Sequence, residues 1–303
     1  MKVIFNADDF GLSRAINAGI IEAYEHGLLK SASLVVTGEA AQDAVEGATS
    51  HPGLDIGLHT TLIEELPALP PGQIPSLVAD GRFHRQRSAL FLRYVLGHWT
   101  VTEAEAEITA QLDRVRAFGL EASHLDGHQH LHLLPRLFPS VIALAQRHGI
   151  RFVRGRISDP LAGTGTLARK ISTLAINTVS RLNWSKIPGS SQVHMISFTT
   201  VGFLQAGGSL TVSYLLSMLD HLRKDPGQSI VEVMLHPGHR DAETERRYGH
   251  WGYQWERDLA LLLDQTLPEA LARRGIEVTS FRELGAKTDE ASGGRSFGTE
   301  CAT

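Results

Sequence analysis

Four of the chain's 15 histidines fall between residues 124 and 132, in the segment HLDGHQHLH. With the two-residue period of a strand, His124, Asp126 and His128 would share one face. Gly127 and the Leu-Leu-Pro after His132 predict that the strand soon ends, so that only some of these side chains converge. Packing alone gives no reason for so dense a polar stripe, because every buried imidazole needs a polar partner. Imidazole and carboxylate groups are ligands of divalent metal ions, so the segment predicts a metal site.

A pair of carboxylates, Asp8 and Asp9, follows the apolar residues 2–5 in the segment NADDFG. Consecutive residues of a strand point to opposite sides. At the end of a strand, one carboxylate can therefore reach a metal while its neighbour points further along the edge formed by the strand ends. A turn that leads into a helix is the alternative interpretation, since aspartate is favoured at such positions.

Single polar residues end three further apolar runs. His59 ends the run GLH, His236 precedes a Pro-Gly bend in VMLHPG, and Arg154 follows the run at 150–153. Each has a structural alternative: a strand-end histidine, a turn histidine and a salt bridge at the rim, respectively. The functional interpretation of Arg154 is that it holds a substrate.

The elements that must position these residues alternate between strands and helices. Apolar runs predict strands at residues 2–5, 33–36, 54–59, a run ending near 126, 150–153, 195–199, 230–235 and 276–279. Helical patterns such as those at 14–26 and 135–148 separate them, which is typical of a parallel sheet. Seven or eight such units without a break in composition favour one closed or nearly closed (β/α) barrel. A doubly wound sheet is the alternative.

Five of the candidate residues fall at the C-terminal ends of predicted parallel strands: Asp8, Asp9, His59, His128 and His236. In (β/α) barrels this face carries the chemistry. The only cysteine, Cys301, excludes a thiolate zinc site and an internal disulfide framework. We therefore expect one divalent ion, Mg or Zn, with Mn and Co as further alternatives.

Composition limits the remaining function classes. The 303 residues carry a net charge of −4, which argues against a nucleic-acid-binding surface. We expect a single domain over residues 1–287 and a flexible, polar, Gly/Ser-rich tail over 288–303. Residues 63–99, with four prolines, predict an excursion from the barrel.

Acidic residues lie where a signal peptide would continue its apolar core, so we expect a cytoplasmic chain. The oligomeric state is open, with a homodimer as one alternative.

The motifs NADDFG, GLH, HLDGHQHLH and MLHPG, in this order, resemble those of the YdjC-like carbohydrate deacetylases, also called the ChbG/HpnK family. The resemblance covers about residues 1–285. It implies a distorted (β/α) barrel related to polysaccharide deacetylases, and metal-dependent removal of acetyl groups from N-acetylated sugars. It also implies that Asp9, His59 and His128 are metal ligands, Asp8 the catalytic base and His236 the acid.

The substrate within that family is left open by two motifs. The proline-rich stretch ALPPGQIPSLVADGRF is similar to the branch associated with hopanoid biosynthesis, whereas LDGHQH is closer to the chitooligosaccharide branch. The resemblance therefore implies an N-acetylated amino-sugar on a small glycan or a glycolipid, such as a hopanoid-linked N-acetylglucosamine. The alternatives are another metallohydrolase, of the amidohydrolase or phosphoesterase type, and a non-catalytic sugar- or lipid-binding protein.

Two further segments are candidates for contact with the substrate or its surroundings. Aromatic residues cluster after His236, and of these Trp251 and Tyr253 are expected to bind a sugar ring or to pack within their own loop. Residues 166–187 combine an apolar stripe at helical spacing with four basic residues and no acidic residue. This segment is either a barrel helix that packs inward or a peripheral contact with an anionic membrane at its inner face.

Overall fold

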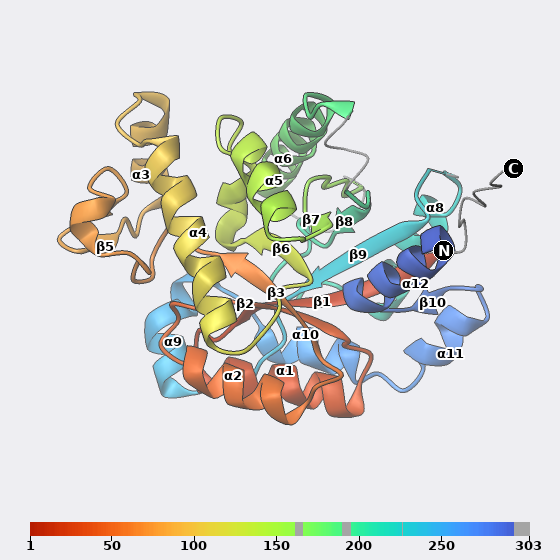
Figure 1. Ribbon diagram of the computed structural model, residues 1–303. Helices are drawn as coiled ribbons and strands as arrows, with labels where there is room; N and C mark the ends of the chain where they lie inside the picture. Colours follow the sequence, from red (N-terminus) through yellow and green to blue (C-terminus); the bar gives the residue numbers. More distant parts are fainter. Residues whose placement is uncertain (161–165, 190–194, 226, 294–303) are drawn as a thin grey trace, which may run out of the picture.

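The computed structural model describes residues 1–160, 166–189, 195–225 and 227–293, and a curved parallel sheet forms its centre (Figure 1). Along the sheet the strands are β7 (Phe152–Val153), β6 (His124–Gly127), β3 (Asp55–Thr60), β2 (Ser31–Leu34), β1 (Lys2–Phe10), β9 (Ile230–Leu235) and β8 (Thr199–Val201). All neighbours in this sheet pair in parallel. A short strand, β10 (Glu277–Val278), pairs with the beginning of β1.

The two edges of this sheet meet through the segment that follows β7. Ile157 forms a parallel bridge with Thr200 of β8. The amide of Thr200 donates to the carbonyl of Arg156 at 2.8 Å, and the amide of Ser158 donates to the carbonyl of Thr200 at 3.0 Å. Read round the ring, the strands then follow chain order from β1 to β9 and return to β1. This order confirms the expected distorted (β/α) barrel and excludes a doubly wound sheet, whose strand order reverses.

Helices surround the barrel, with α1 and α2 below the sheet and α5 and α6 above it in Figure 1. Their bounds are α1 (Arg14–His26), α2 (Ala41–Ser50), α4 (Val101–Ala117), α5 (Phe138–Arg147), α6 (Leu167–Ser185), α8 (Val212–Leu222), α9 (Ala242–Tyr248), α10 (Trp255–Leu262), α11 (Leu267–Ala272) and α12 (Phe281–Gly293). The hydroxyl of Ser13 caps α1 by accepting from the amide of Ile16 at 3.2 Å. This contact satisfies one of the free amides of the first turn.

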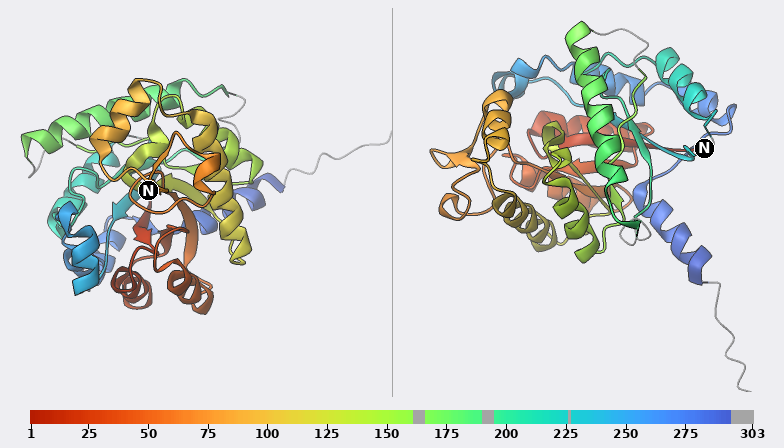
Figure 2. Two further views of the ribbon diagram at one scale, coloured as in Figure 1. Left: turned by 90° about the vertical axis from the view of Figure 1, so that its left-hand side faces the viewer. Right: turned by 90° about the horizontal axis from the view of Figure 1, so that it is seen from above.

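The proline-rich excursion between β3 and α4 forms a small structure of its own. It contains the hairpin β4 (Val78–Ala79) and β5 (Arg82–Phe83), the short helix η1 (Pro71–Gln73) and helix α3 (Arg87–Val95). Figure 1 places this excursion beyond the end towards which β1 and β9 run, and the left panel of Figure 2 looks onto that end. The excursion therefore stands beside the C-terminal face of the barrel.

Helix α6 exposes its apolar side and buries polar residues, which is the reverse of an ordinary barrel helix. Leu167, Ile171 and Leu174 are 76%, 60% and 54% exposed, whereas the polar residues Thr173 and Ser180 are buried. The alternative in which the apolar stripe packs inward is therefore wrong. Periodicity shows that a stripe exists but does not show which side of the helix meets the barrel.

Several boundaries differ from those predicted; for example, β2 covers Ser31–Leu34 and not residues 33–36. The strand expected at residues 195–199 begins only at Thr199, and α12 runs on to Gly293, so the expected domain boundary at residue 287 lies inside a helix. Residues 294–303 of the expected tail lie outside the described residues. None of the helices in the described ranges is both long enough and apolar enough to span a bilayer.

Candidate active site

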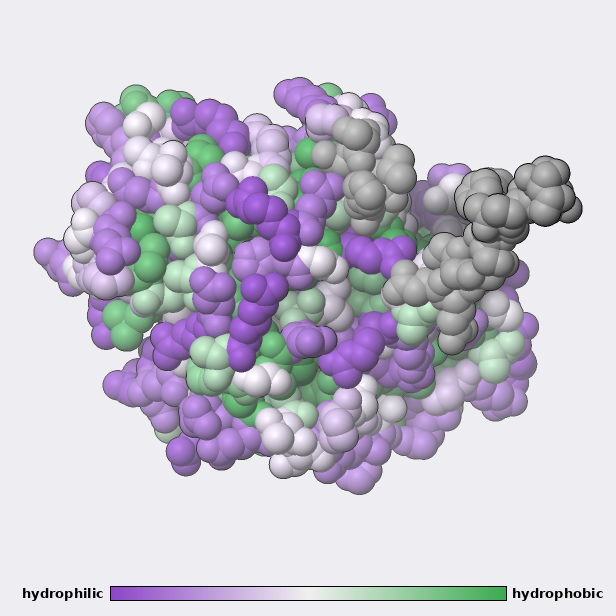
Figure 3. Space-filling model, viewed as in Figure 1, coloured by the Kyte–Doolittle hydropathy of each residue, from purple (hydrophilic) through white to green (hydrophobic). Residues whose placement is uncertain are grey.

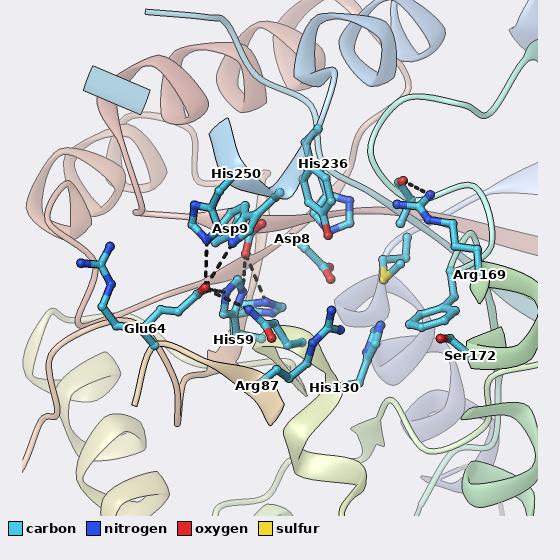
Figure 4. A pocket seen from close by; sticks show the side chains of 18 residues that line it. Asp8, Asp9, His59, Glu64, Arg87, His130, Arg169, Ser172, His236 and His250 are labelled. Carbon is cyan, nitrogen blue, oxygen red and sulfur yellow. Dashed lines mark hydrogen bonds and ion pairs between the residues drawn. The ribbon is translucent and has the colours of Figure 1, made fainter. Parts of the chain in front are cut away.

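A cavity of about 390 Å³ opens at the C-terminal ends of β1, β3, β6 and β9 (Figure 4). Most of the candidate residues line it: Asp8, Asp9, His59, His128, His236, Trp251 and Tyr253. The excursion contributes Glu64, Arg85 and Arg87, and α6 contributes Arg169 and Ser172. The structure thus brings together residues that are as far apart in sequence as 8 and 253.

A break in β1 allows both neighbouring carboxylates to reach this cavity. Asp9 has a φ of 70°, in the left-handed region, and the register between β1 and β2 shifts after Ala7. In a regular strand Asp8 and Asp9 would point to opposite faces. The left-handed residue turns the chain so that the two side chains share one cavity, and such strain is typical of functional sites.

Three buried side chains offer a ligand set for a metal ion. The Oδ1 atom of Asp9 lies 2.9 Å from His128 Nδ1 and 3.4 Å from His59 Nε2. One ligand atom from each residue can be chosen so that all lie within 4.8 Å of one another. The other oxygen of Asp9, Oδ2, is buried without a hydrogen-bond partner among the described residues, although such atoms are normally paired. One carboxylate and two imidazoles suit Zn, Mn or Co and accommodate Mg, so these residues fit the expected ion.

A second acidic group, formed by Asp8, His59 and Asp126, also has ligand atoms within 4.8 Å. Its carboxylates are already bound by a cation. Arg154 Nη1 lies 2.7 Å from Asp8 Oδ2, and Arg154 Nη2 lies 2.6 Å from Asp126 Oδ2. A divalent ion there would face the guanidinium group, so the group around Asp9 is the better metal site.

Asp126 orients one of the proposed ligands. Its Oδ1 atom lies 2.7 Å from His59 Nδ1, which leaves His59 Nε2 directed towards Asp9. Ser33 Oγ donates to the other oxygen of Asp126 at 2.8 Å. A carboxylate behind a ligating histidine fixes its tautomer and ring orientation. The two-residue period of the strand predicts that Asp126 and His128 share a face, but it does not predict this supporting role for Asp126.

Arg154 lies beneath the cavity and does not line it. Its side chain is 1% exposed and binds both oxygens of Asp8 at 2.7 Å, together with Glu232 at 2.6 Å. Burial disfavours its charge, but Asp126 and Asp8 raise the pKa of Arg154 well above its usual value. The contacts assign Arg154 to holding buried carboxylates, in place of the expected direct contact with substrate or a salt bridge at the rim. Clustered buried carboxylates need such a compensating charge.

The remaining histidines of the HLDGHQHLH segment have other surroundings than the ligand set. His124 stacks on Phe281 with ring centroids 4.1 Å apart, and His132 Nε2 lies 2.8 Å from the carbonyl of Arg154. His130 lines the cavity, but burial lowers its pKa well below the usual value. Of the four, only His128 joins the ligand set, because the short helix η2 (His128–Leu133) turns the chain immediately after β6.

His236 directly follows β9, the strand that pairs with β1, and lines the same cavity as the ligand set. Its backbone amide donates to Asp258 Oδ2 at 2.9 Å, and its ring centroid lies 4.6 Å from that of Tyr253. His236 Nδ1 is buried and has no hydrogen-bond partner among the described residues. The imidazole is therefore held from its backbone side and has a ring nitrogen available for chemistry.

Glu64 is a cavity residue that sequence reasoning missed. Its carboxylate lies 3.2 Å from His128 Nε2 and accepts from Gln129 Nε2 at 2.9 Å and from Trp251 Nε1 at 3.3 Å. It lies in the excursion, outside every motif, so the sequence carries no signal for it; in the structure its φ of 67° is left-handed. Glu64 connects the aromatic loop to a proposed metal ligand.

The charges of the ligand set predict competition between metal and protons. Burial opposes the charge on His59 and His128, but Asp126 and Asp8 raise the pKa of His59 to about 10, and Asp9 raises the pKa of His128 to about 9. The metal-free protein then holds protons on both rings at neutral pH, and a metal must displace them. We expect the apparent metal affinity to rise with pH, up to about tenfold per pH unit for each proton released.

Calorimetric metal titrations in buffers of different ionisation enthalpy measure this proton release directly. Because raised pKa values favour the protonated rings, affinity must fall as the pH falls from about 8 to about 6. An affinity that stays constant over that range would contradict the competition.

Comparisons with known proteins place this chain in a family. The family model described as "YdjC-like protein" matches residues 2–273. A protein named carbohydrate deacetylase from Vibrio parahaemolyticus is 32% identical over 289 residues, covering 94% of this chain and 96% of its own. One named chitooligosaccharide deacetylase from Serratia marcescens is 32% identical over 285 residues, covering 93% and 98%.

A solved structure shares the fold. The crystal structure of a putative cellobiose-phosphate cleavage protein from Enterococcus faecalis superposes with a TM-score of 0.71 at 24% identity, covering 93% of this chain and 98% of that one. At this identity the likeness is informative about the barrel alone.

Proposed function

Because this chain belongs to the YdjC-like family, we propose that it hydrolyses the N-acetyl group of an amino-sugar and releases acetate in a metal-dependent reaction. The observation that carries the proposal is one cavity that holds the Asp9–His59–His128 ligand set together with Asp8 and His236. A non-catalytic sugar-binding protein would need neither of the last two residues. Relatives named for carbohydrate and chitooligosaccharide deacetylation support an N-acetylated sugar as the substrate class.

The reaction requires a stronger nucleophile and a better leaving group than water and an amide provide. Asp9, His59 and His128 would hold a divalent ion, and this ion would supply Lewis acidity for the attacking water and the acetyl carbonyl. Asp8 accepts the proton of the attacking water, whose oxygen forms a bond with the carbonyl carbon. As the carbon–nitrogen bond breaks, His236 donates a proton to the nitrogen, so that the sugar leaves as a neutral amine. Acetate is the second product.

The position of Asp8 suits a base. Asn6 Nδ2 donates to Asp8 Oδ1 at 2.9 Å, and Arg154 binds both carboxylate oxygens. These contacts fix the carboxylate in one orientation. Oδ1 accepts two hydrogen bonds and Oδ2 only one, so Oδ2 retains a lone pair that can accept a proton. Glu232 and Asp126 share Arg154, so Asp8 is one of several carboxylates that the guanidinium compensates.

Acetate release from N-acetylglucosamine oligomers tests the proposal. We expect release by the metal-loaded protein, loss of release after chelation, and recovery when Zn, Mn, Co or Mg is returned. A folded, metal-loaded protein that releases no acetate from any N-acetylated sugar but cleaves phosphate esters would replace the proposal with a phosphoesterase.

Trp251 is expected to bind the sugar ring. Its indole lies at the cavity wall, with its ring centroid 5.1 Å from that of His128 and 4.7 Å from that of Tyr248. Trp251→Ala should raise KM by roughly three- to tenfold with little change in kcat, since aromatic stacking contributes about 0.5–1.5 kcal/mol. Steady-state kinetics on a chitooligosaccharide measure this effect.

Trp251→Phe is the matched control. It keeps an aromatic face but loses the indole N–H that donates to Glu64. If stacking is what matters, phenylalanine should restore most of the affinity. A large fall in melting temperature with an unchanged KM would instead assign Trp251 to packing of its own loop.

A further inference from the structure

The large apolar side chains exposed on this protein are concentrated on two helices. Among the described residues, those that are at least 45% exposed are Leu66, Phe91, Leu92, Val95, Leu96, Leu167, Ile171, Leu174 and Leu182. The last four lie on α6, and four of the others lie on or directly after α3. On each helix the spacing places them along one side. Large apolar side chains that gather on one side of a helix and stay exposed mark a candidate site of interaction.

Helix α6 meets the barrel through Ile176, Trp184 and several polar contacts, whereas its four exposed apolar side chains face away from the core. Asn183 Nδ2 donates to the carbonyl of Leu133 at 2.6 Å, and Ser180 Oγ donates to the carbonyl of Ile157 at 3.2 Å. These residues are buried, whereas Leu182 between them in the sequence is 50% exposed. A helix that only covers the barrel would present its leucines inward. The outward-facing leucines of α6 therefore indicate a second role for this helix.

The same two regions are free of acidic residues. Residues 81–102, which contain α3, have four arginines and no Asp or Glu. Residues 160–219, which contain α6, have four Arg or Lys and again no Asp or Glu. The whole chain has a net charge of −4, so positive charge is concentrated where the apolar side chains are exposed.

Both helices stand on one side of the barrel, next to the cavity. Figures 1 and 2 show α3 and α6 above the sheet, and Figure 3 shows hydrophobic surface over α3 at the upper left. Each helix also contributes to the cavity wall, α3 through Arg87 and α6 through Arg169 and Ser172. A surface that covered these two helices would therefore lie at the mouth of the cavity.

We propose that α3 and α6 together form a docking face for an anionic lipid bilayer. Exposed leucine, isoleucine, valine and phenylalanine side chains would enter the boundary between headgroups and acyl chains, while flanking Arg and Lys side chains contact acidic headgroups. A second copy of this chain fits less well. Each copy would bring the same acid-free, basic surface to the contact, and like charges would face each other.

Docking in this orientation brings the cavity to the lipid surface. If the proposed deacetylation is correct, on which this step rests, the substrate class is a sugar attached to a membrane lipid. A soluble oligosaccharide would need no such surface. The docking itself does not depend on the reaction, so the two can fail separately.

Co-sedimentation with vesicles tests the docking. The unmodified protein should sediment with phosphatidylglycerol vesicles at low salt, detach at high salt, and bind phosphatidylcholine vesicles at least about tenfold more weakly. Lys170→Gln/Arg181→Gln/Lys186→Gln should weaken binding to phosphatidylglycerol by about a hundredfold, from the attraction expected per basic residue. Ile171→Ser/Leu174→Ser should weaken it by at least about tenfold.

The matched control is Arg223→Gln/Lys224→Gln/Arg273→Gln, which removes the same charge from other parts of the surface. It should leave vesicle binding unchanged. All of the substituted residues are at least partly exposed, so melting temperatures should be unaltered and acetate release from soluble sugars should persist. Absence of vesicle binding at low salt would overturn the proposal. So would analytical ultracentrifugation showing a dimer that Ile171→Ser/Leu174→Ser converts to monomer, since α6 would then be a contact between copies.

Discussion

Replacing Asp9, His59 or His128 by alanine is expected to abolish metal binding and acetate release together. Each substitution removes one of the three proposed ligands, which are buried at the end of β1, β3 or β6. The two ligands that remain should hold an ion weakly. Loss of Lewis acid assistance amounts to several kcal/mol of transition-state stabilisation, so acetate release should fall by roughly a thousandfold or more. Elemental analysis of the purified proteins and an acetate assay measure the two effects.

Asp126→Asn is the matched control for this series. It keeps the shape of a side chain that orients His59 Nδ1 without joining the ligand set. Loss of such a supporting carboxylate typically costs about 10- to 100-fold in metal affinity, which excess metal should overcome. If Asp126→Asn lost its metal as completely as Asp9→Ala, the ion would belong to the group of Asp8, His59 and Asp126.

The sequence was sufficient to predict the barrel and the face that carries its site. Apolar runs and helical patterns alternate regularly, and polar residues end several of the runs, as at His59 and His236. Because parallel strands end on the same side of a barrel, these residues had to be neighbours in space. That inference needs only the period and direction of the strands, both of which are visible in sequence.

The contacts of single side chains depend on tertiary structure and were not predictable in this way. Arg154 follows a strand as the other candidates do, but it points beneath the cavity because the charges of Asp8, Asp126 and Glu232 are buried there. Glu64 lies in a loop whose path is set by its left-handed φ and by contacts with His128 and Trp251.

The direction in which α6 faces was unpredictable for a different reason. Its leucines and its buried polar residues follow the same helical period, so either side could have met the barrel. Which side of α6 faces the barrel depends on hydrogen-bond partners such as the carbonyls of Leu133 and Ile157, which are distant in sequence. A hydrophobic stripe is therefore evidence for a helix but not for its orientation.

Asp8→Asn should distinguish the roles of Asp8 and Asp9, because the variant is expected to keep its metal but to lose turnover. Asparagine has the shape of aspartate but cannot accept the proton of the attacking water, and removal of a general base typically costs about 10²–10⁴-fold in kcat. Arg154 would keep Glu232 and Asp126 as partners, so the guanidinium would not be left buried without a countercharge. The variant should therefore fold, bind metal with the stoichiometry of the unmodified protein, and bind substrate with a similar KM.

The comparison with Asp9→Ala decides between the roles of Asp8 and Asp9. Both residues line one cavity and are adjacent in the chain, so a general disturbance of the β1 end would affect metal and turnover alike in both variants. Retention of metal in Asp8→Asn alone would establish that the left-handed turn at Asp9 assigns one carboxylate to the metal and its neighbour to the proton. If Asp8→Asn lost its metal and Asp9→Asn kept it, the assignments would have to be exchanged, and Arg154 would then stabilise a ligand rather than the base.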